Sequence, residues 1–113
     1  PQRDISQDRS DMSVYVDRLR QTPLYWLRKA FGWRYKTYCH LFADSDGELF
    51  DFATTKLGLS MEWLQGTVGG NPPHYDLTEN KRVLAIKFGA VNLSDEKLVQ
   101  FIKQRRALHD HTS

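Results

Sequence analysis

The strongest constraint on the fold is a buried strand that is predicted to run directly into a helix near the middle of the chain. Residues 36–43 (KTYCHLFA) are rich in apolar and aromatic side chains, which favours a central strand. Ser45 and Glu48 then have the spacing of a capping box, and an apolar stripe follows from Leu49 to Leu57. A strand followed at once by a helix predicts an α/β domain, in which a short mixed sheet packs against about three helices.

The remaining elements are predicted on both sides of this unit. Residues 13–17 (SVYVD) form the β-branched and aromatic run that is typical of a strand. Thr78 is a good N-cap for a helix over residues 79–88, whose apolar side chains on nearly every side predict deep burial, with a strand over residues 82–88 as the alternative. Two more predicted elements are a short helical turn over residues 60–65 with Trp63 buried, and a last helix from the cap Ser94 to about Leu108.

Length and composition predict one globular domain. The chain has 113 residues and an ordinary hydrophobic content of 40%. We expect a flexible extension over residues 1–11, a single α/β domain over residues 12–108 and a frayed tail over residues 109–113. No apolar run approaches the roughly 20 residues of a membrane helix, so no membrane partner is expected. The single cysteine, Cys39, excludes an internal disulfide and multi-cysteine zinc modules, which favours a cytoplasmic location.

The basic charge is concentrated in one aromatic-rich segment, although the net charge is only +2. Six basic residues and no acidic residue lie between Arg18 and Cys39. Cations that contact phosphates beside rings that stack on bases are typical of nucleic-acid binding. The alternative, which we prefer, is that the rings complete a small core and the cations extend over them into solvent. Nucleic-acid binding would use Arg18, Arg20, Trp26, Arg28, Lys29, Trp33 and Arg34.

Two histidine–aspartate pairs are the candidate chemistry. His40 and Asp44 lie four residues apart along a predicted strand and so share a face. His74 and Asp76 follow a loop rich in glycine and proline. Together these side chains suit either a general acid and base without metal or a site for a divalent metal such as zinc, manganese or iron. Asp17, at the end of the first predicted strand, is a further candidate metal ligand.

Several of these side chains also have a purely structural interpretation. His40 could be a core histidine bonded to backbone, Asp17 a turn residue, and Asp76 an additional cap for the following helix. We expect His74 to contribute little to packing, because it follows two prolines in a loop that we expect to be exposed. Cys39 alternates with His40 along the strand and should face the other way, which argues against a Cys–His nucleophilic pair.

Lys81 and Arg82 predict an anion site. Both lie in the first turn or so of the helix that Thr78 caps, where cations oppose the positive end of the helix dipole. A bound phosphate or carboxylate would reverse the effect, because backbone N–H groups and both cations would converge on it. The alternative is that both side chains point to solvent, at a cost of roughly a few tenths of a kcal/mol.

Three blocks of the sequence resemble the DUF4031 family. They are MSVYVD from Met12, CHLFADSDGEL from Cys39 and PHYDLTENKRVLAIKFGA from Pro73, and the resemblance extends roughly to Arg106. The family is uncharacterised, so the resemblance implies a compact bacterial or phage cytoplasmic domain and no particular activity. The blocks contain seven of the candidate residues, which indicates that these seven form one site: Asp17, His40, Asp44, His74, Asp76, Lys81 and Arg82.

The function that we expect is a hydrolase or related enzyme that acts on a phosphorylated substrate, a nucleotide or nucleic acid. A metal-dependent phosphoesterase or nuclease would use the catalytic candidates His40, Asp44, His74 and Asp76, with Lys81 and Arg82 as a phosphate clamp. One alternative is a non-catalytic module that binds nucleic acid or a nucleotide. Another is a small protein-interaction factor of the phage type, whose partner would be a protein. The sequence predicts neither the substrate, nor the metal, nor the oligomeric state.

Overall fold

The computed structural model describes residues 14–30, 32, 34–65 and 72–112, with side chains up to residue 107. The predicted extension over residues 1–11 and the candidate Trp33 lie outside this part of the chain. In the part of the chain that is described, no helix combines the length and the apolar character that crossing a membrane requires.

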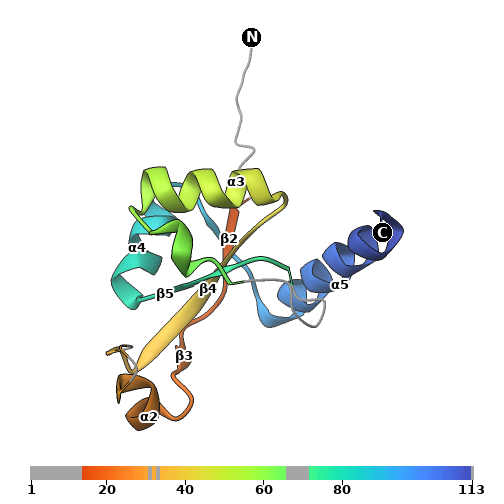
Figure 1. The fold of residues 1–113 in the computed structure, drawn as a ribbon. Helices are drawn as coiled ribbons and strands as arrows, with labels where there is room; N and C mark the ends of the chain where they lie inside the picture. The colour runs from red at the N-terminus through yellow and green to blue at the C-terminus, as the bar shows by residue number, and fades with distance from the viewer. Residues whose placement is uncertain (1–13, 31, 33, 66–71, 113) are drawn as a thin grey trace.

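A mixed five-stranded sheet forms the centre of the domain (Figure 1). Its central strand is β4 (Thr37–Ala43), which pairs antiparallel with β2 (Val14–Val16) on one side and with β5 (Tyr75–Leu77) on the other. The two-residue strand β3 (Arg20–Gln21) pairs antiparallel with the start of β4. Strand β6 (Val91–Asn92) runs parallel to β2 and makes the sheet mixed. The predicted α/β class with a short mixed sheet is therefore confirmed.

One face of the sheet carries the main core. Alternate side chains of β4, Cys39 and Leu41 among them, are buried there against α3 (Asp46–Asp51), its π-helical continuation Phe52–Lys56, and α4 (Glu79–Lys87). The predicted N-cap of α3 is confirmed, because the Ser45 hydroxyl accepts the Glu48 backbone N–H at 3.2 Å. The Glu48 carboxylate accepts from the Ser45 hydroxyl at 2.9 Å, whereas a capping box would use the Ser45 backbone N–H.

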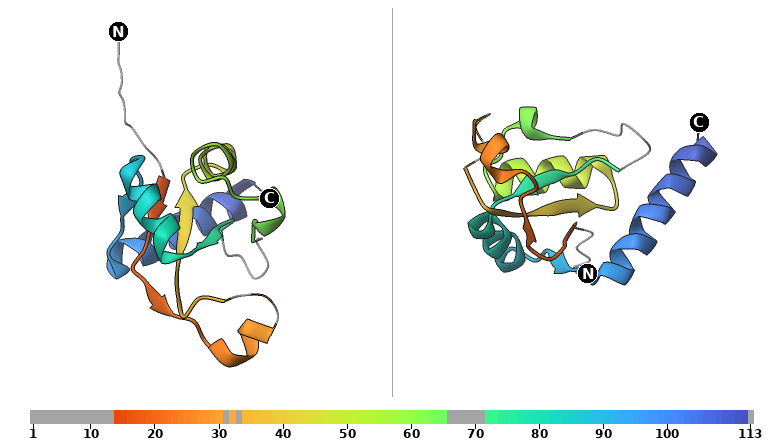
Figure 2. Two further views of the ribbon diagram at one scale, coloured as in Figure 1. Left: turned by 90° about the vertical axis from the view of Figure 1, so that its left-hand side faces the viewer. Right: turned by 90° about the horizontal axis from the view of Figure 1, so that it is seen from below.

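The opposite face is only partly covered. Phe42 packs there with Tyr15 of β2 and with Leu98 and Phe101 of α5 (Asp95–Thr112), in a smaller apolar cluster. Helix α5 then projects away from the domain (Figures 1 and 2) and continues past the predicted end near Leu108. In the described part of the chain, the apolar cluster does not extend past Phe42, and the rest of this face carries polar side chains.

Two burial predictions are wrong. Thr78 does cap α4, by accepting the Lys81 backbone N–H at 3.2 Å, but only Ala85 of that helix is fully buried and Val83 is 62% exposed. Trp63, which we expected in the core, lies at the end of the 3-10 turn η2 (Met61–Trp63) and is 59% exposed. Both predictions counted apolar side chains as core without knowing whether another element lies over them.

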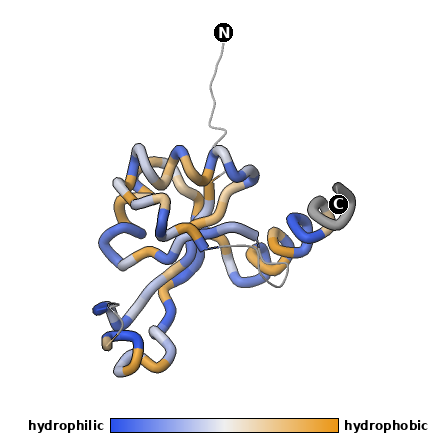
Figure 3. Tube along the Cα trace, viewed as in Figure 1, coloured by the Kyte–Doolittle hydropathy of each residue, from blue (hydrophilic) through white to orange (hydrophobic). Residues whose placement is uncertain are grey.

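The described aromatic side chains of the helix in the basic-aromatic segment are not part of the core either. This helix, α2 (Tyr25–Ala30), has no buried residue, and Trp26 is 71% exposed. Figure 3 shows apolar residues on this helix, which projects from the end of the sheet. The interpretation that we preferred for these rings is therefore wrong for Trp26, and the segment has surface available for another role.

Candidate metal centre

Strand register brings His40, His74 and Asp76 together on the partly covered face of the sheet. His40 of β4 and Asp76 of β5 are directly opposite one another. His74 precedes Asp76 by two residues and therefore lies on the same side of the strand. One ligand atom from each of the three half-buried side chains lies within 4.8 Å of those of the other two. The sequence predicted that these residues meet, and the geometry agrees with that prediction.

Asp17 approaches His40 from the other neighbouring strand. It follows β2 directly, and its side chain is fully buried. Its Oδ1 accepts the backbone N–H of His40 at 2.7 Å, and its Oδ2 lies 2.7 Å from His40 Nδ1. The guanidinium of Arg20 lies 3.2 Å from the same Oδ2. Asp17, His40 and Asp76 thus form one row of side chains across three neighbouring strands.

These contacts determine the tautomer of His40. Burial alone would raise the pKa of Asp17, but the hydrogen bonds from His40 and the charge of Arg20 hold that pKa below its ordinary value. The ionised carboxylate accepts a hydrogen bond from Nδ1–H, so a neutral His40 carries its lone pair on Nε2. That Nε2 lies 3.9 Å from Oδ1 of Asp76. Two ligands that are each about 2.1 Å from one metal ion lie about 3–4 Å apart, so this separation suits a shared ion.

His74 is oriented in the same way. Its Nδ1 lies 3.1 Å from the carbonyl oxygen of Pro72, which can only accept, so a neutral ring has its lone pair on Nε2. The rings of His74 and His40 are nearly perpendicular, at 84°, with centroids 5.2 Å apart. Histidines that bind metal commonly donate the other ring N–H to a carboxylate or a backbone carbonyl. His40 has the first kind of acceptor and His74 has the second.

Two side chains that sequence analysis did not connect with this group hold Asp76. The amide of Gln65 donates to Oδ2 of Asp76 at 2.8 Å, and the guanidinium of Arg28 lies 3.9 Å from the same oxygen. Gln65 also forms a β-bridge with His74, which places it beside both residues. Nothing in the local sequence of Gln65 indicates this contact, because it depends on the pairing of segments far apart in the chain.

Asp44 is not brought into the group. It is exposed, and both of its carboxylate oxygens lie 3.1 Å from the hydroxyl of Tyr15. The expectation that Asp44 shares a face with His40 extended the alternation of β4 by one residue, but the strand ends at Ala43. Among the described side chains, those whose ligand atoms converge as a metal site requires do not include Asp44.

The two predicted anion ligands make contacts within the protein. The ammonium group of Lys81 donates to the carbonyl of Leu57 at 2.6 Å. The guanidinium of Arg82 donates to the backbone carbonyl of Asp17 and to the side chain of Asn92, both at 2.9 Å. Arg82 thereby ties α4 to the chain that follows β2 and to β6, which gives it a structural role.

Three of the arginines that nucleic-acid binding would use contact different carboxylates of the protein. Arg18 lies 3.1 Å from Asp95, while Arg20 and Arg28 lie near Asp17 and Asp76. The side chains of Trp26, Lys29 and Arg34 are exposed. Binding of nucleic acid by this segment stays a prediction.

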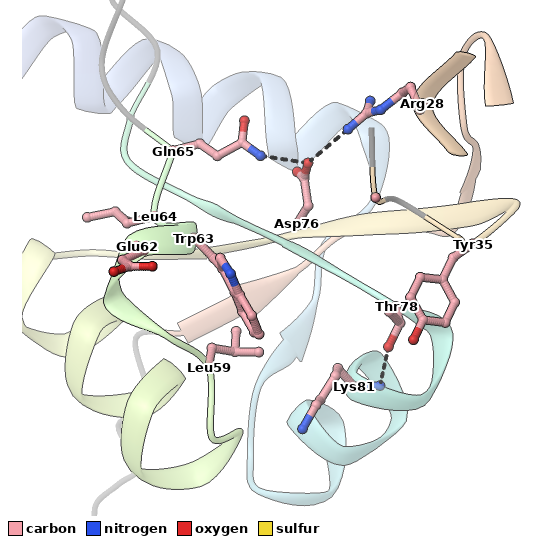
Figure 4. A pocket seen from close by; sticks show the side chains of 11 residues that line it. Arg28, Tyr35, Leu59, Glu62, Trp63, Leu64, Gln65, Asp76, Thr78 and Lys81 are labelled. Carbon is pink, nitrogen blue, oxygen red and sulfur yellow. Dashed lines mark hydrogen bonds and ion pairs between the residues drawn. The ribbon is translucent and has the colours of Figure 1, made fainter. Parts of the chain in front are cut away.

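A pocket of about 530 Å³ adjoins the histidine–aspartate group (Figure 4). Asp76 and Gln65 line it, so these two residues belong both to the pocket and to the group. Its lining holds two cations, Arg28 and Lys81, and a second carboxylate, Glu62. This volume lies within the range of about 300–1,000 Å³ that is common for small-molecule sites.

Comparison with known proteins supplies a family and no activity. A family model described as "Protein of unknown function (DUF4031)" matches residues 24–105. The matched range includes His40, His74 and Asp76 and begins after Asp17. No curated protein and no solved structure matches the chain.

Proposed function

We propose that this chain, which belongs to the DUF4031 family, is a hydrolase that uses a divalent metal ion to act on a phosphorylated substrate. The observation that carries the proposal is the convergence of ligand atoms from His40, His74 and Asp76 within 4.8 Å. Two imidazoles and one carboxylate are a donor set of catalytic zinc and non-haem iron sites. Three protein ligands leave coordination positions for water and substrate.

The surroundings of the three ligands support a catalytic site. When bound, a divalent ion lowers the pKa of a bound water and polarises a phosphoryl oxygen. Asp17 holds the ring of His40 with Nε2 toward Asp76, and Gln65 holds the carboxylate of Asp76. Side chains that are oriented in this way need little rearrangement when they bind an ion, which favours tight binding.

Positive charge beside the group favours an anionic substrate. The guanidinium of Arg28 lies 3.9 Å from the carboxylate of Asp76, on the wall of the adjoining pocket. Lys81 lines the same pocket, and its ammonium group has three donors, of which the contact with Leu57 uses one. We therefore assign the phosphate contact beside Asp76 to Arg28, keep Lys81 as a second cation of the pocket, and leave Arg82 out of the clamp.

A reaction without metal is the second candidate. The short contact between Asp17 and His40 also orients an imidazole for use as a general base, with Nε2 as the reactive atom. In that case the reaction would persist in a chelator. Hydrolysis that is lost in chelator and restored by metal favours the first candidate.

The test is a metal titration of protein stripped with a chelator. We expect about one zinc or manganese ion per chain, with an affinity that falls at least about 100-fold in each of the variants His40→Ala, His74→Ala and Asp76→Asn. Hydrolysis of p-nitrophenyl phosphate or its bis ester should require the metal and should disappear in the same variants.

Two controls separate this site from other carboxylates and histidines. Asp44→Asn removes an exposed carboxylate that follows the same strand and lies outside the group, so it should bind metal as the wild type does. Replacement of His109 and His111 by alanine removes the histidines of the tail, and it should also leave the affinity unchanged. Binding that follows the tail histidines, or no binding by the wild type, would show that the proposal is wrong.

A further inference from the structure

The pocket beside Asp76 has aromatic side chains on two walls. Trp63 extends from η2 on one side, and Tyr35, which precedes β4, lies on the other (Figure 4). Both rings are accessible, with Trp63 59% exposed and Tyr35 51% exposed. A flat ligand that enters the pocket therefore meets the surfaces of aromatic rings.

The exposure of Trp63 is informative because tryptophan has a large apolar surface. Burial of such a side chain normally stabilises a small domain, so a tryptophan that is left mostly exposed contributes little to folding. An exposed indole on the wall of a pocket is well suited to stack on a ligand. Proteins that bind nucleic-acid bases without sequence preference commonly stack them on aromatic side chains.

The opposite part of the pocket is polar and charged. Asp76, Gln65 and Arg28 lie together there, and Gln65 and Arg28 both contact the carboxylate that we assign to the metal. A molecule that spans the pocket would thus have a flat apolar part between the rings and an anionic part beside the metal ligands. A nucleotide has this distribution, since it carries a planar base and a phosphate at its two ends.

We infer that the pocket between Trp63 and Tyr35 binds the base of a nucleotide whose phosphate lies beside Arg28, His40 and Asp76. This inference rests on the proposed function and names the substrate class of that same site. The pocket volume of about 530 Å³ suits one nucleotide unit, so the favoured ligand is a mononucleotide.

The experiment compares ligands with and without a base. Zinc-loaded protein is titrated by calorimetry with the 5′-monophosphates of adenosine, guanosine, cytidine and uridine, and with ribose 5-phosphate. We expect the tightest of the four nucleotides to bind about tenfold or more tightly than ribose 5-phosphate, because only the nucleotides stack. In Trp63→Ala and in Tyr35→Ala this preference should fall to threefold or less, while the affinity for zinc stays unchanged.

Matched variants keep the result specific to the pocket. Trp63→Phe retains a ring and should keep most of the preference. Trp26→Ala removes a tryptophan that is 71% exposed on α2 and does not line the pocket, so its preference should equal that of the wild type. Equal binding of nucleotides and ribose 5-phosphate by the wild type, or an unchanged preference in Trp63→Ala, overturns the inference.

The outcomes also separate this inference from the proposed function. Zinc binding at the histidine–aspartate group without any preference for nucleotides overturns the assignment of the base and leaves a metal-dependent hydrolase of some other phosphate. A preference that depends on Trp63 in a protein that binds no zinc supports the base pocket and contradicts the metal-dependent reaction. Longer single strands that bind more tightly than any mononucleotide, in a manner that depends on Trp26, overturn the choice of a mononucleotide.

Discussion

Oδ2 of Asp17 lies 2.7 Å from Nδ1 of His40, and the same carboxylate accepts the backbone N–H of His40 through Oδ1 at 2.7 Å. One fully buried side chain thus binds both the main chain of β4 and the ring that this strand presents to the candidate metal centre. The pair determines which nitrogen of His40 remains available, and the proposed metal chemistry depends on that nitrogen.

Replacement of Asp17 should weaken metal binding although all three ligands remain. In Asp17→Asn the side-chain amide can donate to Nδ1 of His40, which favours the tautomer with its proton on Nε2. Loss of such an outer partner typically lowers metal affinity about 10- to 100-fold. A zinc titration against a competing chelator measures the effect, with Asp44→Asn as the carboxylate control. An affinity within twofold of the wild type would show that Asp17 does not position His40.

The stability of the protein should fall in acid through Asp17. Its pKa in the folded chain lies below the ordinary value of 3.8, so the unfolded chain takes up this proton first as the pH falls. The stabilisation is therefore complete above about pH 5 and is lost as the pH falls from there through the folded pKa. Urea unfolding between pH 5 and pH 2.5 measures how the free energy of unfolding falls with pH. It should fall more steeply in the wild type than in Asp17→Asn, and the difference should correspond to the uptake of up to about one proton on unfolding. Equal slopes would assign the acid sensitivity to other carboxylates.

Tyr75→Phe should stabilise the protein. Tyr75 lies on the core side of β5 with no exposed surface, and its hydroxyl has no hydrogen-bond partner in the part of the chain that the structure describes. Burial of an unpaired polar group costs about 1–3 kcal/mol, and phenylalanine keeps the ring. We expect an increase of about 1 kcal/mol in the free energy of unfolding by urea, with zinc affinity unchanged. A less stable Tyr75→Phe would indicate that the hydroxyl has a partner after all.

The grouping of His40 with His74 and Asp76 was predicted only from their residue types, because it depends on the pairing of β4 with β5, a strand that the sequence analysis did not predict. The sequence placed His40 in a strand, and the spacing of His74 and Asp76 by two residues gives them a common side in any extended segment. The contact of Asp17 with His40 was not predictable either, since it depends on the register between β2 and β4. Asp17 was chosen only because it ends a predicted strand.

Burial and the direction of long side chains are what the sequence alone does not determine. Trp63 and Val83 are apolar, but whether they are buried depends on whether another element lies over them. Lys81 and Arg82 have the position of anion ligands, yet their side chains are long enough to reach carbonyl groups of Leu57 and Asp17. The types of these residues are known from the sequence, but their partners depend on how α4 packs on the sheet.

The thiol of Cys39 should be unreactive in the folded protein. Cys39 is fully buried on the core side of β4, and burial raises its pKa to about 12. Iodoacetamide should leave it unmodified at pH 8 in native buffer and should alkylate it quickly in urea, as mass spectrometry can follow. Rapid alkylation of native protein would contradict the burial of this strand.

Zinc should slow the modification of Cys39 although it does not bind that side chain. Cys39 and His40 are neighbours on β4, so an opening that exposes the thiol also separates His40 from His74 and Asp76. A ligand at 100 times its dissociation constant stabilises the closed form by about 2.7 kcal/mol, which corresponds to roughly 100-fold slower modification when opening is reversible. His74→Ala retains Cys39 and lacks one ligand, so zinc should have little effect on its rate. Equal protection by zinc in both proteins would place the metal elsewhere and would contradict the centre formed by His40, His74 and Asp76.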